Sequence, residues 1–147
     1  MPIIFYHLNK PYGSFTNYSN HGFELDGWYW PTVEHYYQAQ KVLGTELFEL
    51  VLTADSPALA KRIANSDKNC RKNDWAEMKI EIMRKSVFKK FESHEDLRNL
   101  LLATGEEELV EGSKTDYFWG SGKDGTGQNI LGKILMEIRD QFRHNIV

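Results

Sequence analysis

The residues with the clearest chemical potential lie between positions 30 and 41, in the run Trp-Pro-Thr-Val-Glu-His-Tyr-Tyr-Gln-Ala-Gln-Lys. Helical side chains are about 100° apart, so a helix here would place Glu34, Gln38 and Lys41 on one stripe. Thr45 would continue that stripe one turn later. A carboxylate, an amide and an amine in line can transfer protons and attack an electrophilic carbon. The same stripe is also typical of a solvated helix face whose aromatic neighbours form the core.

A glycine-rich stretch over residues 111–132 is the second place where ligand chemistry is expected. Asp116 and Trp119 flank two further aromatics, and a tryptophan face can stack on a sugar or a base. The glycines allow a close backbone approach, and the loop leads into a helix N-terminus, which favours anions. The literal G-x-G-x-x-G match at residues 120–125 does not indicate a dinucleotide fold, because too few residues follow it. The alternatives are a flexible surface loop, a core role for Trp119 and a turn cap at Asp116.

Composition predicts one globular domain over residues 1–147. Hydrophobic residues make up 41% of the chain and charged residues 27%, and the net charge is −3. Residues 61–90 nevertheless carry ten basic and four acidic side chains, a net charge of +6. This basic segment, which includes Arg71 and Lys72, can attract a phosphate-bearing ligand. A solvated helix with mixed charges is the alternative.

Several classes of protein are not expected. No apolar run approaches the ~18 residues of a membrane span, and the opening Met-Pro-Ile-Ile-Phe-Tyr does not resemble a signal peptide. The single cysteine, Cys70, excludes an internal disulfide and suits a reducing cytosol, so a cytoplasmic protein is expected. The five histidines show no paired helical spacing, and we expect neither a metal nor another cofactor.

The pattern of elements predicts a mainly α fold, a compact multihelical single domain with a small N-terminal β-hairpin element. Asp26-Gly27 is a strong hairpin signal between two short aromatic runs. Ser56-Pro57 marks a helix start, with a cap followed by proline at the first helical position. Strands are expected at 3–8, 23–25, 28–30 and 109–111, and helices near 32–52, 57–65, 74–91, 94–103 and 129–143.

Two of these stretches together resemble the NADAR, or YbiA-like, family. Residues 32–41 match its pattern Thr-x-Glu-His-x-x-Gln-Ala-x-Lys, and residues 109–139, from Leu-Val-Glu through Asp-Tyr-Phe-Trp-Gly to Met-Glu-Ile-Arg, resemble its C-terminal block. The early Gly-Ser-Phe-x-Asn17 and the Arg71 to Trp75 segment also fit. The departures are small: Thr16 replaces a frequent serine, and the loop after Gly120 carries Lys-Asp.

The resemblance implies a compact, mostly helical fold and an N-glycosidase that cleaves a ribose C1–N bond. Family members act on phosphoribosylamino-pyrimidine intermediates of riboflavin biosynthesis or on ADP-ribosylated guanine in DNA or nucleotides. Some are antitoxins to a DNA ADP-ribosyltransferase, which would then be a partner. The resemblance makes Glu34, Lys41 and Asp116 the candidate catalytic residues. The candidate substrate-binding residues are Asn17, Gln38, Arg71, Trp75, Trp119, Gly120 and Asn129.

The residue types suggest separate roles in such a reaction. Glu34 suits proton transfer and cation stabilisation, and Asp116 can hold ribose hydroxyls or a water. Lys41 can attack C1 and form a Schiff base if burial lowers its pKa, while direct hydrolysis stays open as the other route. A non-catalytic module that binds ADP-ribose or a related nucleotide is the alternative function.

Overall fold

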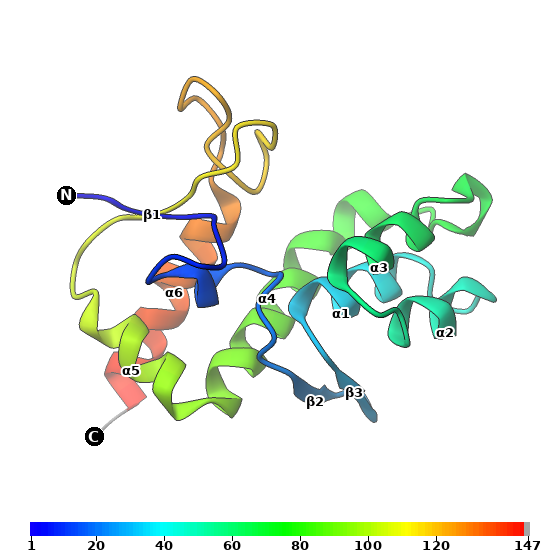
Figure 1. The fold of residues 1–147 in the computed structure, drawn as a ribbon, viewed down its shortest axis with the longest axis horizontal. Helices are drawn as coiled ribbons and strands as arrows, with labels where there is room; N and C mark the ends of the chain where they lie inside the picture. Colours follow the sequence, from blue (N-terminus) through cyan, green and yellow to red (C-terminus); the bar gives the residue numbers. More distant parts are fainter. Residues whose placement is uncertain (146–147) are drawn as a thin grey trace. The chain divides into compact units, whose positions relative to one another are not determined.

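The computed structural model describes residues 1–145 and is mainly helical, as predicted (Figure 1). The helices are α1 (Val33–Lys41), α2 (Leu47–Leu52), α3 (Pro57–Ala64), α4 (Trp75–Ser93), α5 (Glu95–Ala103) and α6 (Ile130–Asn145). The strands are β1 (Ile3–Phe5), β2 (Phe23–Leu25), β3 (Trp28–Trp30) and β4 (Leu109–Glu111). The chain divides into two compact units, residues 17–90 and residues 1–16 with 91 onward, and the prediction of one domain over residues 1–147 stays a prediction.

The predicted hairpin opens the unit of residues 17–90. Strands β2 and β3 are antiparallel, with Phe23 opposite Trp30. Asp26 and Gly27 form the turn with φ of 55° and 83°. Two left-handed residues are what a tight two-residue hairpin turn requires, and an Asx-Gly pair supplies them at low cost. The hairpin leads the chain directly into α1 (Figure 1).

The predicted single helix over residues 32–52 is wrong, because two helices occupy this stretch. Thr32 caps α1 as expected, its hydroxyl accepting the His35 amide at 3.1 Å. The helix ends at Lys41, and Gly44 then adopts a left-handed φ of 84°, which ends the helical path. Thr45 lies in the connection, where its hydroxyl accepts the Leu47 amide at 3.2 Å. Thr45 is therefore not part of the α1 stripe.

Helix α1 is buried along nearly its whole length. It packs against α2 and α3, and β3 also contacts it. Trp30 meets Tyr36 edge-on with ring centroids 5.1 Å apart, and it meets Phe48 of α2 at 5.8 Å. Every residue from Val33 to Ala39 is buried, polar ones included. The predicted alternative of a solvated helix face is therefore wrong for this stripe.

The second unit is organised around β4. Strand β1 pairs with it in parallel over three residues, from Ile3 opposite Leu109 to Phe5 opposite Glu111. The expected strand to residue 8 is therefore shorter, since its partner β4 ends at Glu111. Helix α6 packs closely on β4: a Cβ at Gly132 would lie 2.1 Å from the Leu109 carbonyl oxygen. This close approach places the start of α6 directly beside the strand.

Candidate functional site

A buried lysine is the most unusual feature of the unit of residues 17–90. The Lys41 side chain comes from the last turn of α1 and is only 7% exposed. Its Nζ lies 5.6 Å from the Tyr37 ring centroid and 5.7 Å from that of Trp75. The two rings pack on each other with centroids 5.0 Å apart. Nζ donates one hydrogen bond, to Oδ1 of Asn65 at 3.2 Å.

Burial lowers the pKa of the Lys41 amine to about 8. The positive charge of Arg71 contributes to this lowering, while the Glu34 carboxylate acts in the opposite direction. Lys61 and Lys79 also lower the pKa of Lys41. At pH 7 about a tenth of such amines are neutral, against fewer than about one in a thousand at an ordinary lysine pKa. Lys41 therefore has the protonation behaviour that a nucleophilic amine requires.

Glu34 and Gln38, about two turns and one turn before Lys41, form a hydrogen-bonded pair. Gln38 Nε2 donates to Glu34 Oε2 at 2.8 Å. This bond fixes the amide so that Gln38 Oε1 faces away from the carboxylate. Oε1 has no hydrogen-bond donor among the described residues, although Gln38 is only 2% exposed. A buried acceptor without a donor costs about 1–3 kcal/mol, which a donor on a bound molecule would recover.

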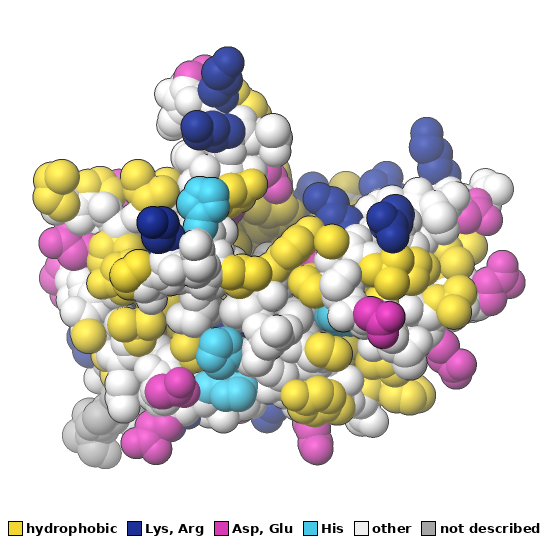
Figure 2. Space-filling model, in the orientation of Figure 1, with side chains coloured by type: hydrophobic (Ala, Val, Ile, Leu, Met, Phe, Trp, Pro, Cys, Tyr) yellow, Lys and Arg dark blue, Asp and Glu magenta, His cyan; other side chains and the backbone are white. Residues whose placement is uncertain are grey.

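The structure brings together most of the predicted residues of this unit. Trp75 lies under the Lys41 amine, and the exposed Arg71 is close enough for its charge to act on it. The Asn17 carbonyl accepts a hydrogen bond from the Glu34 amide at 3.1 Å. The side-chain Nδ2 of Asn17 donates to the Met83 sulfur at 3.4 Å. Figure 2 shows Lys and Arg side chains gathered over α3 and the loop that follows it. Substrate binding by these residues stays a prediction.

Asp116 and Trp119 lie in the other unit, in the loop between β4 and α6. Asp116 Oδ1 accepts the amides of Phe118 at 3.0 Å and Trp119 at 2.8 Å. The turn-cap interpretation of Asp116 is therefore confirmed for this oxygen. The Trp119 ring packs edge-on against Phe118, with centroids 4.8 Å apart, and Trp119 is half-buried. A catalytic role for Asp116 and a stacking role for Trp119 stay predictions.

Asn129 and Gly120 have clear structural contacts in the same unit. The Asn129 amide bridges β4, since its Oδ1 accepts the Glu111 amide and its Nδ2 donates to the Leu109 carbonyl, each at 2.9 Å. A Cβ at Gly120 would lie 2.2 Å from the Glu111 carboxylate and 3.0 Å from the Glu111 carbonyl oxygen, so a larger residue there would displace that carboxylate. Both residues could be recognised from the sequence, but not these contacts. Their substrate-binding roles stay predictions.

The prediction of an anion site at the start of α6 is wrong. The amide of Ile130 donates to the Phe118 carbonyl at 3.0 Å, and that of Leu131 donates to the Trp119 carbonyl at 3.1 Å. These are the first two amides of α6, which an anion would need. Because the preceding loop folds back onto them, they are not available to a ligand.

Two buried ionisable groups were not among the predicted site residues. Glu111 Oε1 accepts the Ser113 amide at 2.9 Å. Burial, together with the charge of Asp116, raises the pKa of Glu111 to about 7, and the Ser113 hydrogen bond opposes the rise. Burial also lowers the pKa of Lys90, which is 1% exposed, to about 7. Neither shift is readable from the sequence, because both depend on how deeply the folded chain buries each group.

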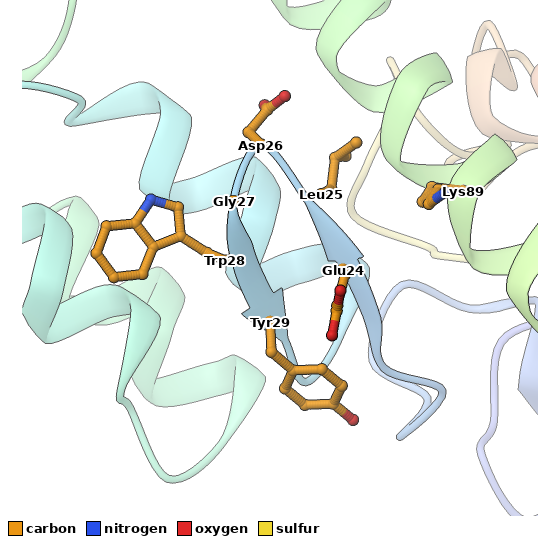
Figure 3. A pocket seen from close by; sticks show the side chains of 7 residues that line it. All are labelled: Glu24, Leu25, Asp26, Gly27, Trp28, Tyr29 and Lys89. Carbon is orange, nitrogen blue, oxygen red and sulfur yellow. The ribbon is translucent and has the colours of Figure 1, made fainter.

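A pocket of about 470 Å³ lies on the hairpin and contains none of the predicted site residues. Its lining comes from β2, β3 and the turn between them, together with Lys89 of α4 (Figure 3). Trp28 and Tyr29 project in different directions from β3.

Within residues 1–145 there is no cluster of three or more potential metal ligands. No helix in this range has the length and apolar character that crossing a membrane requires.

Comparison with known proteins gives a consistent result over nearly the whole chain. A family model described as NADAR domain matches residues 4–143. The chain is 45% identical over 147 residues to an N-glycosidase of Nostoc punctiforme, covering 98% of this chain and 94% of that protein. It is 42% identical over 140 residues to N-glycosidase YbiA of Escherichia coli strain K12, covering 95% of this chain and 88% of that protein.

The fold and a third relative agree with this result. The NMR structure of the Escherichia coli protein YbiA matches with a TM-score of 0.88 and 41% identity, covering 97% of this chain and 84% of that one. The mainly helical, YbiA-like fold is thereby confirmed. A riboflavin biosynthesis protein of Vibrio vulnificus is 40% identical over 144 residues. The match covers 98% of this chain but only 39% of that longer protein.

The raised pKa of Glu111 predicts a pH-dependent gain in stability for Glu111→Gln. The neutral carboxyl is favoured in the folded state, so its contribution is complete below the unfolded pKa of 4.5 and is lost as pH rises to about 7. Urea unfolding should therefore show the variant gaining about 1–3 kcal/mol on the original protein between pH 4.5 and 7, and no more above pH 7. Glu108→Gln, at an exposed neighbour, controls for loss of one carboxylate. A pH-independent difference for Glu111→Gln would contradict this account.

Proposed function

We propose that this chain, which belongs to the NADAR family and is an N-glycosidase, hydrolyses the ribose C1–N bond of a phosphoribosylamino-pyrimidine intermediate of riboflavin biosynthesis. The observation that carries the proposed mechanism is the Lys41 amine, buried over two aromatic rings with a pKa near 8. The choice of substrate is supported by the name of the Vibrio vulnificus relative, a riboflavin biosynthesis protein.

Cleavage of this bond builds positive charge on the sugar and negative charge on the departing nitrogen. Glu34 is proposed to stabilise both of these developing charges. It delivers its proton to the leaving nitrogen, and the carboxylate that results stabilises the positive charge at C1. The hydrogen bond from Gln38 holds Glu34 Oε2 in place for this work.

Lys41 is proposed to carry a covalent step. Its neutral amine attacks C1 while the C1–N bond to the base breaks and the base leaves with a proton from Glu34. The sugar ring then opens: one proton moves from Nζ to O4, the C1–O4 bond breaks, and C1 forms a protonated Schiff base with Nζ. Water adds to this C1, the C1–Nζ bond breaks, and free sugar and Lys41 are released. The net reaction consumes one water and needs no oxidant, reductant or metal.

The remaining predicted residues have proposed binding roles. Trp75 forms the wall beneath the Lys41 amine, and Arg71 supplies positive charge beside it for a substrate phosphate. Gln38 Oε1 can accept a hydrogen bond from a substrate N–H or hydroxyl, since it has no donor among residues 1–145. Asp116 is proposed as the second carboxylate, which holds ribose hydroxyls or a water with the oxygen that the turn does not use.

ADP-ribosylated guanine, in DNA or in a nucleotide, is a second candidate substrate for the same chemistry. The +6 charge of residues 61–90 suits the diphosphate of ADP-ribose as well as a single phosphate. Removal of ADP-ribose from guanine would reverse the modification that a DNA ADP-ribosyltransferase makes. The protein would then serve as an antitoxin. A non-catalytic ADP-ribose-binding module, by contrast, gives no account of an amine of lowered pKa beside a carboxylate.

The substrate proposal is tested by incubating the protein separately with the phosphoribosylamino-pyrimidine and with ADP-ribosylated guanine DNA. Chromatography should show release of the free pyrimidine at a kcat/KM at least about tenfold above that for guanine release, a difference of ~1.4 kcal/mol in transition-state binding. Faster release of unmodified guanine from DNA, with a rate that falls steeply with salt, would replace the first substrate by the second.

The role of Glu34 predicts a large loss of rate in Glu34→Gln, which keeps the shape and can still accept the Gln38 hydrogen bond. Loss of the acid should lower kcat at least ~100-fold, measured as release of free base under saturating substrate. Glu49→Gln, at an exposed position of α2, is the matched control and should keep the full rate. An unchanged kcat in a folded Glu34→Gln protein would remove Glu34 from the mechanism.

A further inference from the structure

Asn65, the residue that ends α3, provides the hydrogen-bond acceptor for the Lys41 amine. Its Oδ1 lies 3.2 Å from Lys41 Nζ. The two residues are 24 positions apart, on different helices, and neither their types nor their spacing suggests the contact. Asn65 is itself exposed to solvent, whereas Lys41 is buried.

The orientation of the Asn65 amide is fixed by its own helix. Nδ2 donates to the Lys61 carbonyl at 2.8 Å, and the Asn65 backbone amide donates to the same carbonyl at 3.2 Å. Turning the amide over would set Oδ1 against this carbonyl and an N–H group against the lysine amine. Both contacts would then be unfavourable, so Oδ1 stays directed at Nζ.

The acceptor is also uncharged, which is important because of the charges around it. Four charges act on the amine: Glu34 from α1, Lys61 from α3, Arg71 from the following loop and Lys79 from α4. The three cations favour the neutral amine, and only Glu34 favours the charged one. A carboxylate at position 65 would add a second anion in direct contact and reverse this balance.

We propose that Asn65 is a positioning residue for the glycosidase reaction: it aims the Lys41 amine with an oxygen that carries no charge. This inference rests on the proposed function, since it matters for catalysis only if Lys41 is the nucleophile. Asn65 fixes the direction of the amine through Oδ1 and leaves the amine free to lose its proton. An aspartate would still offer an oxygen to the amine, but it would lose the bond to the Lys61 carbonyl and its charge would keep the amine protonated.

Two variants separate these effects. Asn65→Asp should raise the pKa of Lys41 by about one unit or more, so the rate falls about tenfold at pH 7 and recovers above pH 9. Asn65→Ala should lower kcat about tenfold at every pH, with KM within about twofold of the original, because the amine is no longer aimed. Loss of folding would not reproduce a rate that returns with pH.

The matched control is Asn69→Asp, which adds the same charge to an exposed position nearby. The neighbours Asp67 and Lys68 are not among the charges that act on Lys41, so this variant should keep both the original rate and the original pH profile. The pKa of Lys41 is measured without substrate, from the pH dependence of reductive methylation of its amine, followed by mass spectrometry.

The outcomes distinguish this inference from the proposed function. An unshifted pKa of Lys41 in Asn65→Asp, or full kcat in Asn65→Ala, would overturn the role of Asn65. Full activity in Lys41→Ala would instead overturn the nucleophile, and with it any catalytic purpose for Asn65, whatever the methylation experiment shows.

Discussion

The burial of α1 is the constraint on which the rest of this structure depends. A helix that carries a glutamate, a glutamine and a lysine on one stripe would ordinarily turn that stripe to water. Here α2, α3 and the aromatic residues of the hairpin surround it. Each buried polar group must then form a hydrogen bond, because an unsatisfied one lowers the stability of the folded state. Glu34 accepts a hydrogen bond from the Gln38 amide, Lys41 donates one to Asn65, and Gln38 Oε1 alone is left without a donor among the described residues.

The same burial changes the chemistry of the lysine. An exposed lysine is charged at neutral pH and is a poor nucleophile, whereas Lys41 shares its surroundings with two aromatic rings and neighbouring cations. These features make the charged amine less favourable in the folded protein and so reduce stability below pH 8. Costs of this kind are common at sites that perform chemistry.

Much of the fold was predictable from local signals. Asp26-Gly27 specified the hairpin, Ser56-Pro57 specified the start of α3, and the motif of α1 pointed to Glu34 and Lys41. The break at Gly44 was missed because helical periodicity continues across it, and only the left-handed φ of the folded chain reveals the stop. The contact with Asn65 was beyond prediction, as were the raised pKa of Glu111 and the occupied amides of α6. These features depend on distant segments meeting, which no local pattern encodes.

The covalent role of Lys41 is tested most directly by reduction during turnover. Borohydride added to the protein with its substrate should reduce the Schiff base and leave the opened sugar attached to the peptide that contains Lys41, as peptide mass spectrometry would show. Lys41→Arg should give no adduct, since its guanidinium stays protonated. Continued turnover of substrate in borohydride, with every copy of Lys41 unmodified, would contradict the account.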